Sequence, residues 1–156
     1  MILRIQHLYL ALAAIASILC FFFPFAVYLS DLAYYKLMLT GFIHISPDPG
    51  NVFPFYFTFP LLGFHLLLSV HIILAIISYK SRPKQLKVIR FALLINILYI
   101  AVLFFYTNFV IERNVAIPSH YGPGSYFPLI MLILIMMAKR GIEKDDKLIR
   151  SMDRLR

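Results

Sequence analysis

Two histidines in an apolar part of the chain, His65 and His71, are the side chains best suited to chemistry in this sequence. An imidazole can ligate a metal or a haem iron or carry a proton, and ionisable groups inside a membrane are costly and usually functional. The two point roughly 120° apart on an ideal helix, whereas one shared metal needs a spacing of roughly three or four residues. A haem with two histidine ligands would need a ligand from another apolar stretch, and the others contain no histidine. We therefore expect no cofactor within one subunit; a haem shared between subunits stays open.

Ser17 and Asn96 are polar residues of two other apolar stretches, and their positions predict the same depth as His71. All three would lie about 12 Å from the inner membrane boundary, at roughly 1.5 Å per helical residue. Two interpretations of this polar layer are open. Its side chains can hydrogen-bond across helices, each bond contributing about 1 kcal/mol or less, or they can form a proton or ligand site together with His65. We favour the first, because small residues around Ser17 allow close helix packing.

Four apolar stretches must position these side chains. A helix needs about 20 apolar residues to cross a hydrocarbon core of roughly 30 Å. The second and third stretches are expected to form a hairpin that ends near Tyr79 and resumes near Val88, which sets His71 level with Asn96. The last stretch is the shortest, and it is long enough only if the helix starts near Pro123 or if Lys139 and Arg140 reach the interface. The predicted spans cover residues 8–29, 57–79, 88–109 and 123–138.

The composition is that of a membrane protein. Hydrophobic residues make up 62% of the 156 residues and charged residues 14%, against roughly half and a quarter in soluble domains. This balance excludes a disordered chain and a coiled coil, and a single cysteine excludes a disulfide scaffold. The predicted fold class is an all-α membrane protein with four transmembrane helices in one domain over residues 1–138.

The positive charges predict the orientation of the spans. Of the 15 lysines and arginines, only Lys36 and Arg113 fall in the two connections on one side, and the other 13 fall at the N-terminus, in the middle connection and in the C-terminal tail. Basic residues stay on the cytoplasmic side of a membrane. Both termini are therefore expected in the cytoplasm of a bacterium, and the net charge of +8 is expected to face lipid headgroups and not nucleic acid.

The long first outer connection carries a strand signal. Residues 34–45 alternate, with the apolar side chains on one side and Lys36, Thr40 and His44 on the other. A period of two predicts a half-buried strand, and residues 110–117 offer a partner for it. We expect a small β-ribbon over the outer face; an irregular segment held by aromatic residues at the interface is the alternative.

The tail over residues 139–156 predicts a short amphipathic cytoplasmic helix. Gly141 weakens its junction with the last span and predicts a bend. Such a helix can lie on the lipid surface or dock a cytoplasmic partner. The apolar residues that recur at helical spacing are Ile142, Leu148, Ile149, Met152 and Leu155.

Three segments carry a family resemblance: RIQHLYLALAAI at residues 4–15, YKSRPKQLK at 79–87 and the tail KRGIEKDDKLIRSMDRLR. They resemble a family of small four-span proteins of the Gram-negative Bacteroidota, the Domain of Unknown Function 4293. That family usually has Thr or Ser where this chain has His7, so the resemblance assigns His7 no role. It implies an inner-membrane location and no particular activity. If the two cytoplasmic ends form the working surface, the candidate docking residues are Arg4, Gln6, Arg150, Ser151, Asp153 and Arg154.

No serine–histidine–acid grouping, paired carboxylate site or metal cluster is visible in the sequence, so we expect no enzymatic activity. The expected function is that of a non-catalytic accessory or scaffolding subunit of a larger inner-membrane assembly, bound to another membrane protein or to a second copy. The alternative is a redox or proton-handling protein with haem or quinone near His65 and His71. A monomeric transporter is disfavoured, because every Asp and Glu lies outside the predicted spans.

Overall fold

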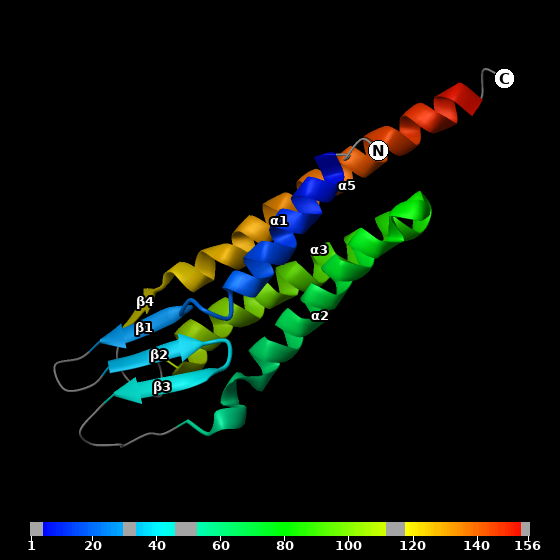
Figure 1. Ribbon diagram of the computed structural model, residues 1–156. Helices are drawn as coiled ribbons and strands as arrows, with labels where there is room; N and C mark the ends of the chain where they lie inside the picture. The colour runs from blue at the N-terminus through cyan, green and yellow to red at the C-terminus, as the bar shows by residue number, and fades with distance from the viewer. Residues whose placement is uncertain (1–4, 30–33, 46–52, 112–117, 154–156) are drawn as a thin grey trace.

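The computed structural model describes residues 5–29, 34–45, 53–111 and 118–153. At residues 45, 55, 110 and 148–153 it describes the backbone alone. Within the described residues, four helices run side by side along the molecule (Figure 1), and a small sheet lies at one end. We call that end the sheet end. The opposite end, where α1 begins, α2 turns into α3 and α5 finishes, is called the terminal end. The long helices are α1 (Ile5–Leu19), α2 (Phe59–Ile77), α3 (Arg82–Phe105) and α5 (Tyr126–Asp153).

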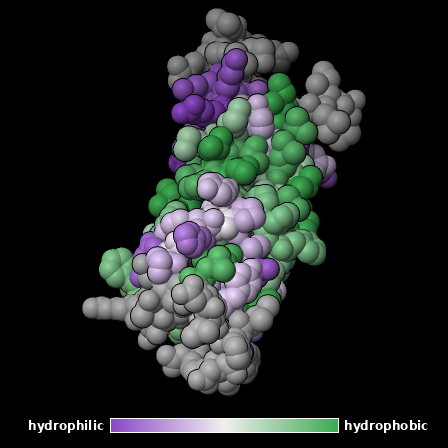
Figure 2. Space-filling model, turned by 90° about the vertical axis from the view of Figure 1, so that its left-hand side faces the viewer, coloured by the Kyte–Doolittle hydropathy of each residue, from purple (hydrophilic) through white to green (hydrophobic). Residues whose placement is uncertain are grey.

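Short helical segments extend these helices: η1 (Phe55–Thr58), η2 (Ser78–Lys80), the π-helix η3 (Tyr106–Ile111) and η4 (Pro123–Ser125). Helix α1 packs on α5 and α2, and α3 packs on α2 and α5. Each helix buries one stripe. The exposed faces of α1, of α2 and of α3 beyond Arg90 are also apolar, as in a helix that spans a membrane, whereas the far half of α5 exposes charged side chains. Figure 2 shows apolar side chains across the upper middle of one face and along its right side, with strongly hydrophilic ones above them and mostly weakly hydrophilic ones below. Among the described residues, three stretches are long and apolar enough to cross a membrane: Tyr56–Lys80, Arg82–Phe109 and Pro123–Lys147.

The first predicted span is wrong in its second half. Helix α1 has only 15 residues, and residues 26–29 belong to a strand. The helix tightens after Leu19, since the N–H of Phe21 donates to Ile18 O and that of Phe22 to Leu19 O. Pro24 follows, and because proline has no N–H and its ring clashes with the preceding turn, no helix continues through it.

The sheet is antiparallel, in the order β3-β2-β1-β4. Its strands are β1 (Ala26–Leu29), β2 (Tyr34–Met38), β3 (Gly41–Ile45) and β4 (Ser119–Tyr121). A small sheet was expected, but residues 34–45 form a hairpin and not one strand. The pairing Tyr35↔His44 therefore puts His44 on the face of Leu37, not opposite it. In the expected partner segment, residues 110 and 111 belong to η3, and residues 112–117 lie outside the described part.

The inner face of the sheet closes the sheet end of the helices. Ala26, Tyr28 and Leu37 are fully buried there, and Tyr28 Oη donates to Thr107 O at 3.0 Å. The turn before α5 lies directly on the segment between α1 and β1, since the Gly124 N–H donates to Pro24 O at 2.9 Å. This approach leaves no room for a side chain at residue 124.

The expected bend at Gly141 is also wrong. Helix α5 is continuous from Tyr126 to Asp153, so the tail is the continuation of the last apolar helix and not a separate one. Gly141 lies where α1 crosses α5: a Cβ on it would be 3.4 Å from Gln6 Cβ. The glycine thus serves close packing of two helices. Farther along, Arg82 Nη1 donates to Asp145 O at 3.0 Å, which ties the α2–α3 turn to α5.

Candidate functional site

The deepest polar contacts join α1 to α2 around His65, which is fully buried. Its Nε2 lies 3.1 Å from Ser17 O and 3.2 Å from Ser17 Oγ. A carbonyl oxygen only accepts, so in the neutral imidazole Nε2 carries the hydrogen and donates it to Ser17 O. Ser69 Oγ donates to His65 O at 2.8 Å. The hydrogen between the two hydroxyls, 2.7 Å apart, therefore comes from Ser17.

Helix α3 adds Asn96 and Tyr99, which are also fully buried. The rings of His65 and Tyr99 have centroids 5.5 Å apart, and Asn96 Nδ2 donates to Pro128 O of α5 at 3.3 Å. We call Ser17, His65, Ser69, Asn96 and Tyr99 the polar cluster. Three of its buried atoms, His65 Nδ1, Asn96 Oδ1 and Tyr99 Oη, have no hydrogen-bond partner among the described residues.

His71 is not part of the polar cluster, contrary to the predicted layer. Ser17 and Asn96 are buried as expected, but His65 takes the place of His71 beside Ser17. The His71 Nδ1 donates to Leu67 O of its own helix at 2.8 Å, on the exposed side. His65 and His71 therefore do not face one ligand, and the described residues contain no grouping of three His, Cys, Asp or Glu that could hold a metal ion.

The length of the α2–α3 connection explains the difference. The prediction placed the helix ends near residues 79 and 88, whereas α2 ends at Ile77 and α3 begins at Arg82. Across this tighter turn, Gln85 Nε2 donates to Ala75 O at 2.9 Å. The tighter turn changes which residue of α2 lies level with Asn96. It is about two helical turns from the predicted His71, in the region of His65.

Ser69 and Tyr99 were missed in the sequence, although a signal for both exists. Ser69 follows His65 by four positions and Tyr99 follows Asn96 by three, and residues at these spacings share a helix face. Once His65 and Asn96 are assigned to the interior, the next polar residue on each face belongs there too.

At the terminal end, Gln6 is the one candidate docking residue whose side chain the structure describes. It is 5% exposed and lies against Gly141, so it packs α1 on α5 and is not on a docking surface. The other five residues fall outside the part of the chain with described side chains: Arg4, Arg150, Ser151, Asp153 and Arg154.

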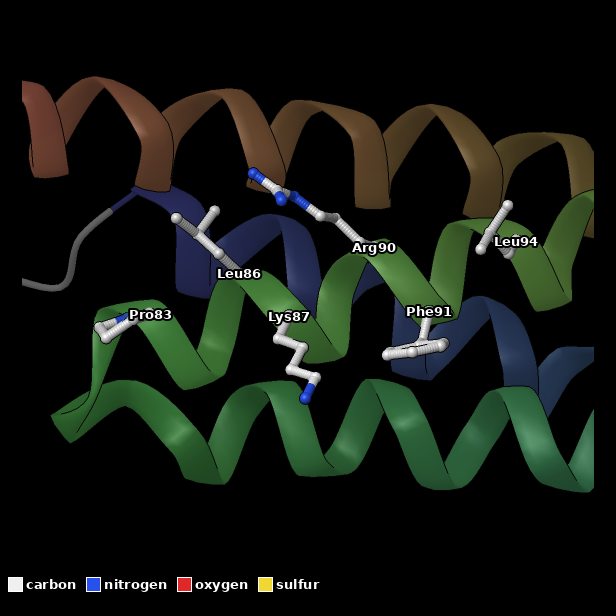
Figure 3. Close-up of a pocket in the computed structure, with 6 residues that line it drawn as sticks. All are labelled: Pro83, Leu86, Lys87, Arg90, Phe91 and Leu94. Carbon is white, nitrogen blue, oxygen red and sulfur yellow. The ribbon is translucent and has the colours of Figure 1, made fainter.

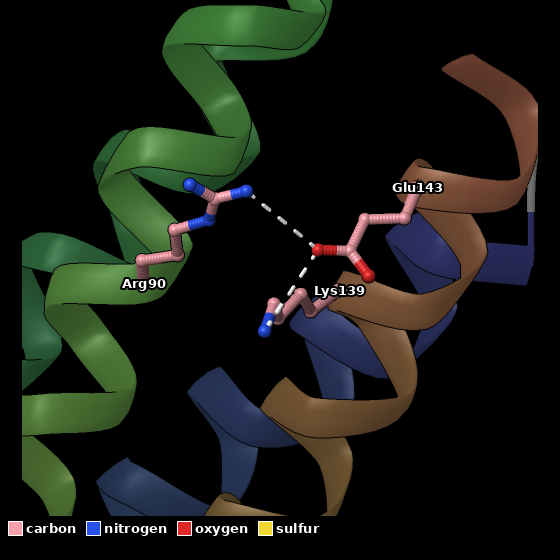
Figure 4. A network of polar contacts seen from close by, with 3 residues as sticks. All are labelled: Arg90, Lys139 and Glu143. Carbon is pink, nitrogen blue, oxygen red and sulfur yellow. Dashed lines mark ion pairs between the residues drawn. The ribbon is translucent and has the colours of Figure 1, made fainter. Parts of the chain in front are cut away.

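Figure 4 shows an ion-pair network at the terminal end that joins α3 to α5. Glu143 Oε1 lies 3.9 Å from Arg90 Nη2 and 3.8 Å from Lys139 Nζ. One carboxylate is thus shared by two cations, and the network keeps a net positive charge. All three side chains are partly exposed, so the pairs contribute little to stability.

The family model described as a domain of unknown function, DUF4293, matches residues 2–155. No curated protein matches the chain.

Proposed function

The chain belongs to the DUF4293 family, and from this premise we propose that it is a non-catalytic protein of the bacterial inner membrane, an accessory or scaffolding subunit of a larger assembly. The proposal rests on one observation: buried polar side chains form hydrogen bonds between the helices. Ser17, His65 and Ser69 bond to one another between α1 and α2, and Asn96 bonds α3 to α5. Polar side chains used in this way hold transmembrane helices together.

The proposed topology has four crossings and both termini in the cytoplasm. It is supported by the arrangement of the helices, since the start of α1, the α2–α3 turn and the far half of α5 share the terminal end. That end carries basic residues such as Arg82, Lys84 and Arg140, whereas Lys36 is the basic residue described at the sheet end. Helix α1 alone covers only about 22 Å at roughly 1.5 Å per residue, so the turn up to Pro24 completes the first crossing.

We propose a partner because the polar side chains of the interior bond to one another, whereas the outer faces of the helices are apolar and exposed. These faces are open to contact with lipid or with another protein. On α1, for example, Ile5, Leu8 and Ile18 are each more than half exposed. Extraction of the full chain from native membranes in mild detergent, followed by mass determination, tests this. We expect a particle with a second chain in fixed ratio to this 18.1 kDa chain, either another membrane protein or a second copy. A single monodisperse chain in every mild detergent contradicts the proposal.

A redox or proton-handling role is the second candidate, and one observation favours it. His65 Nδ1, Asn96 Oδ1 and Tyr99 Oη are buried polar atoms without a partner among the described residues, and such groups mark functional sites in membranes. Visible absorption of the purified protein and mass analysis of its extracted quinones separate the two functions. A haem spectrum or a stoichiometric quinone that disappears in a His65→Leu variant and persists in His71→Leu would favour the second candidate.

A further inference from the structure

An open groove runs along the outer side of α3 near the terminal end. Figure 3 shows its lining, in which two basic side chains lie between a short apolar part that comes first along the helix and a second apolar part that follows them. We propose that this groove binds one anionic phospholipid, with the phosphate between Lys87 and Arg90 and an acyl chain along Phe91 and Leu94. The inference rests on the proposed membrane location. The groove is lined by Pro83, Leu86, Lys87, Arg90, Phe91 and Leu94.

The two cations are placed to share one phosphate. Lys87 and Arg90 are three residues apart on α3, so their Cβ atoms lie roughly 5–6 Å apart on one helix face. In Figure 3 the Lys87 side chain reaches toward α2 and the Arg90 side chain toward α5, on either side of the groove. Because both side chains are long and exposed, each can turn toward an anion that lies on α3 between them.

Arg90 keeps hydrogen-bond donors for a phosphate. Its side chain is 65% exposed, and its distance to Glu143 is 3.9 Å, which is longer than the roughly 2.7–3.2 Å of a hydrogen bond. Glu143 is also shared with Lys139. Lys87 is exposed and has no acidic partner among the described residues. The groove lining thus carries two cations and no carboxylate, which favours an anionic headgroup over a zwitterionic one.

The apolar half of the groove selects a lipid over a soluble phosphate compound. Phe91 is 49% and Leu94 58% exposed, and they begin about one turn or less beyond the cations. Ile97 and Leu98 continue the exposed apolar surface toward the sheet end. A change from cation to hydrocarbon within roughly 5.4 Å of helix fits a molecule whose phosphate is joined to an acyl chain. A free phosphate would leave this half of the groove unused.

The chain contains no tryptophan, so Phe91→Trp introduces a single fluorescent reporter in the groove. The variant is reconstituted in phosphatidylcholine vesicles that contain a small fraction of either dibrominated phosphatidylglycerol or dibrominated phosphatidylcholine. Bromine quenches tryptophan on contact. We expect several-fold stronger quenching by the brominated phosphatidylglycerol. Adding either Lys87→Gln or Arg90→Gln should weaken binding of phosphatidylglycerol by up to about fivefold, and both together should abolish the preference.

Two matched controls separate a site from general attraction to the basic end. Lys80→Gln with Lys84→Gln removes the same charge from the same end outside the groove lining and should leave the preference within about twofold. A Leu8→Trp reporter replaces a side chain that is 59% exposed near the start of α1, and it should show little preference between the two lipids.

Each outcome bears on the proposal. Equal preference at the two reporters, or equal loss with both double substitutions, overturns the site. Relief of quenching by inorganic phosphate at constant ionic strength identifies a free-anion site and overturns the lipid assignment. Absence of quenching by either brominated lipid overturns the membrane location itself, whereas quenching without headgroup preference overturns the lipid site alone. Circular dichroism of every variant confirms that the helices persist.

Discussion

At the scale of single residues, the contact between Ser17 and His65 is the main polar link between α1 and α2. Ser17 offers both its carbonyl and its hydroxyl to the imidazole, so each group compensates part of the cost of burying the other. A double-mutant cycle with Ser17→Ala and His65→Leu, measured by unfolding in mixed micelles, should give a coupling free energy of roughly 0.5–1 kcal/mol.

His71→Leu is the matched control for this cycle, because His71 bonds only its own helix. It should change the free energy of unfolding by less than about 0.5 kcal/mol and show no coupling to Ser17→Ala. Equal coupling of both histidines to Ser17 would contradict the placement of His65.

The second residue-scale prediction concerns Gly124. A Cβ at this position would lie 2.6 Å from Phe23 O and 2.7 Å from Pro24 O, and backbone cannot move away as a flexible side chain can. Gly124→Ala should therefore lower the free energy of unfolding by about 1–3 kcal/mol. Gly63→Ala is the control, since nothing lies within 4 Å of its added Cβ; alanine there should be neutral or stabilising. Similar losses for the two variants would refute the close approach at Gly124.

The residues of the polar cluster show how far the sequence alone could lead. It indicated that Ser17, His65 and Asn96 lie deep, because hydrocarbon makes polar groups conspicuous. It could not indicate which histidine contacts Ser17. That depends on the length of the α2–α3 turn, and the residues around this turn do not show where the two helices end. The predicted end of α2 was two residues too late and the predicted start of α3 six residues too late. These two errors together placed His71, and not His65, at the level of Asn96.

At the scale of elements, the packing of α1 on α5 can be tested by a cross-link. A Cβ at residue 141 would lie 3.4 Å from Gln6 Cβ, close to the roughly 3.8 Å typical of a disulfide. With Cys20 replaced by alanine, Gln6→Cys with Gly141→Cys should form an intramolecular disulfide under mild oxidation, detected by electrophoretic mobility with and without reductant.

Leu8→Cys with Gly141→Cys is the control pair for this cross-link. Leu8 is 59% exposed, whereas Gln6 is buried, so the two side chains leave α1 on different faces. The control pair should remain reduced under the same conditions. Efficient cross-linking of the control, or none of the Gln6 pair, would contradict the contact between α1 and α5.

Element ends were the least predictable part of the fold. Pro24 carried the signal that ends α1, yet the apolar residues on both sides of it hid the change from helix to strand. Residues 34–45 showed strand alternation, but the pairing Met38↔Gly41 closes a hairpin that reverses the face of His44. At Gly141, low helix propensity predicted a bend, whereas packing against Gln6 determines the outcome.

At the scale of the whole molecule, the arrangement of its two ends predicts which residues are accessible from each side of a membrane. Helices α1, α2, α3 and α5 each run between the terminal end and the sheet end, so the two ends lie on opposite sides if the helices cross. Because basic residues are in excess at the terminal end, we propose that this end faces the cytoplasm.

Single cysteines in a Cys20→Ala background test this assignment in intact cells whose outer membrane has been permeabilised. Thr40→Cys replaces an exposed residue in the turn between β2 and β3, and Lys84→Cys an exposed one in the first turn of α3. A membrane-impermeant maleimide should label the cysteine at residue 40 directly and the one at residue 84 only after the inner membrane is opened. The reverse order would invert the orientation while keeping the crossings. Immediate labelling of both would mean that the apolar surface of α2 and α3 is covered by another protein and not by lipid, because that surface cannot remain in water.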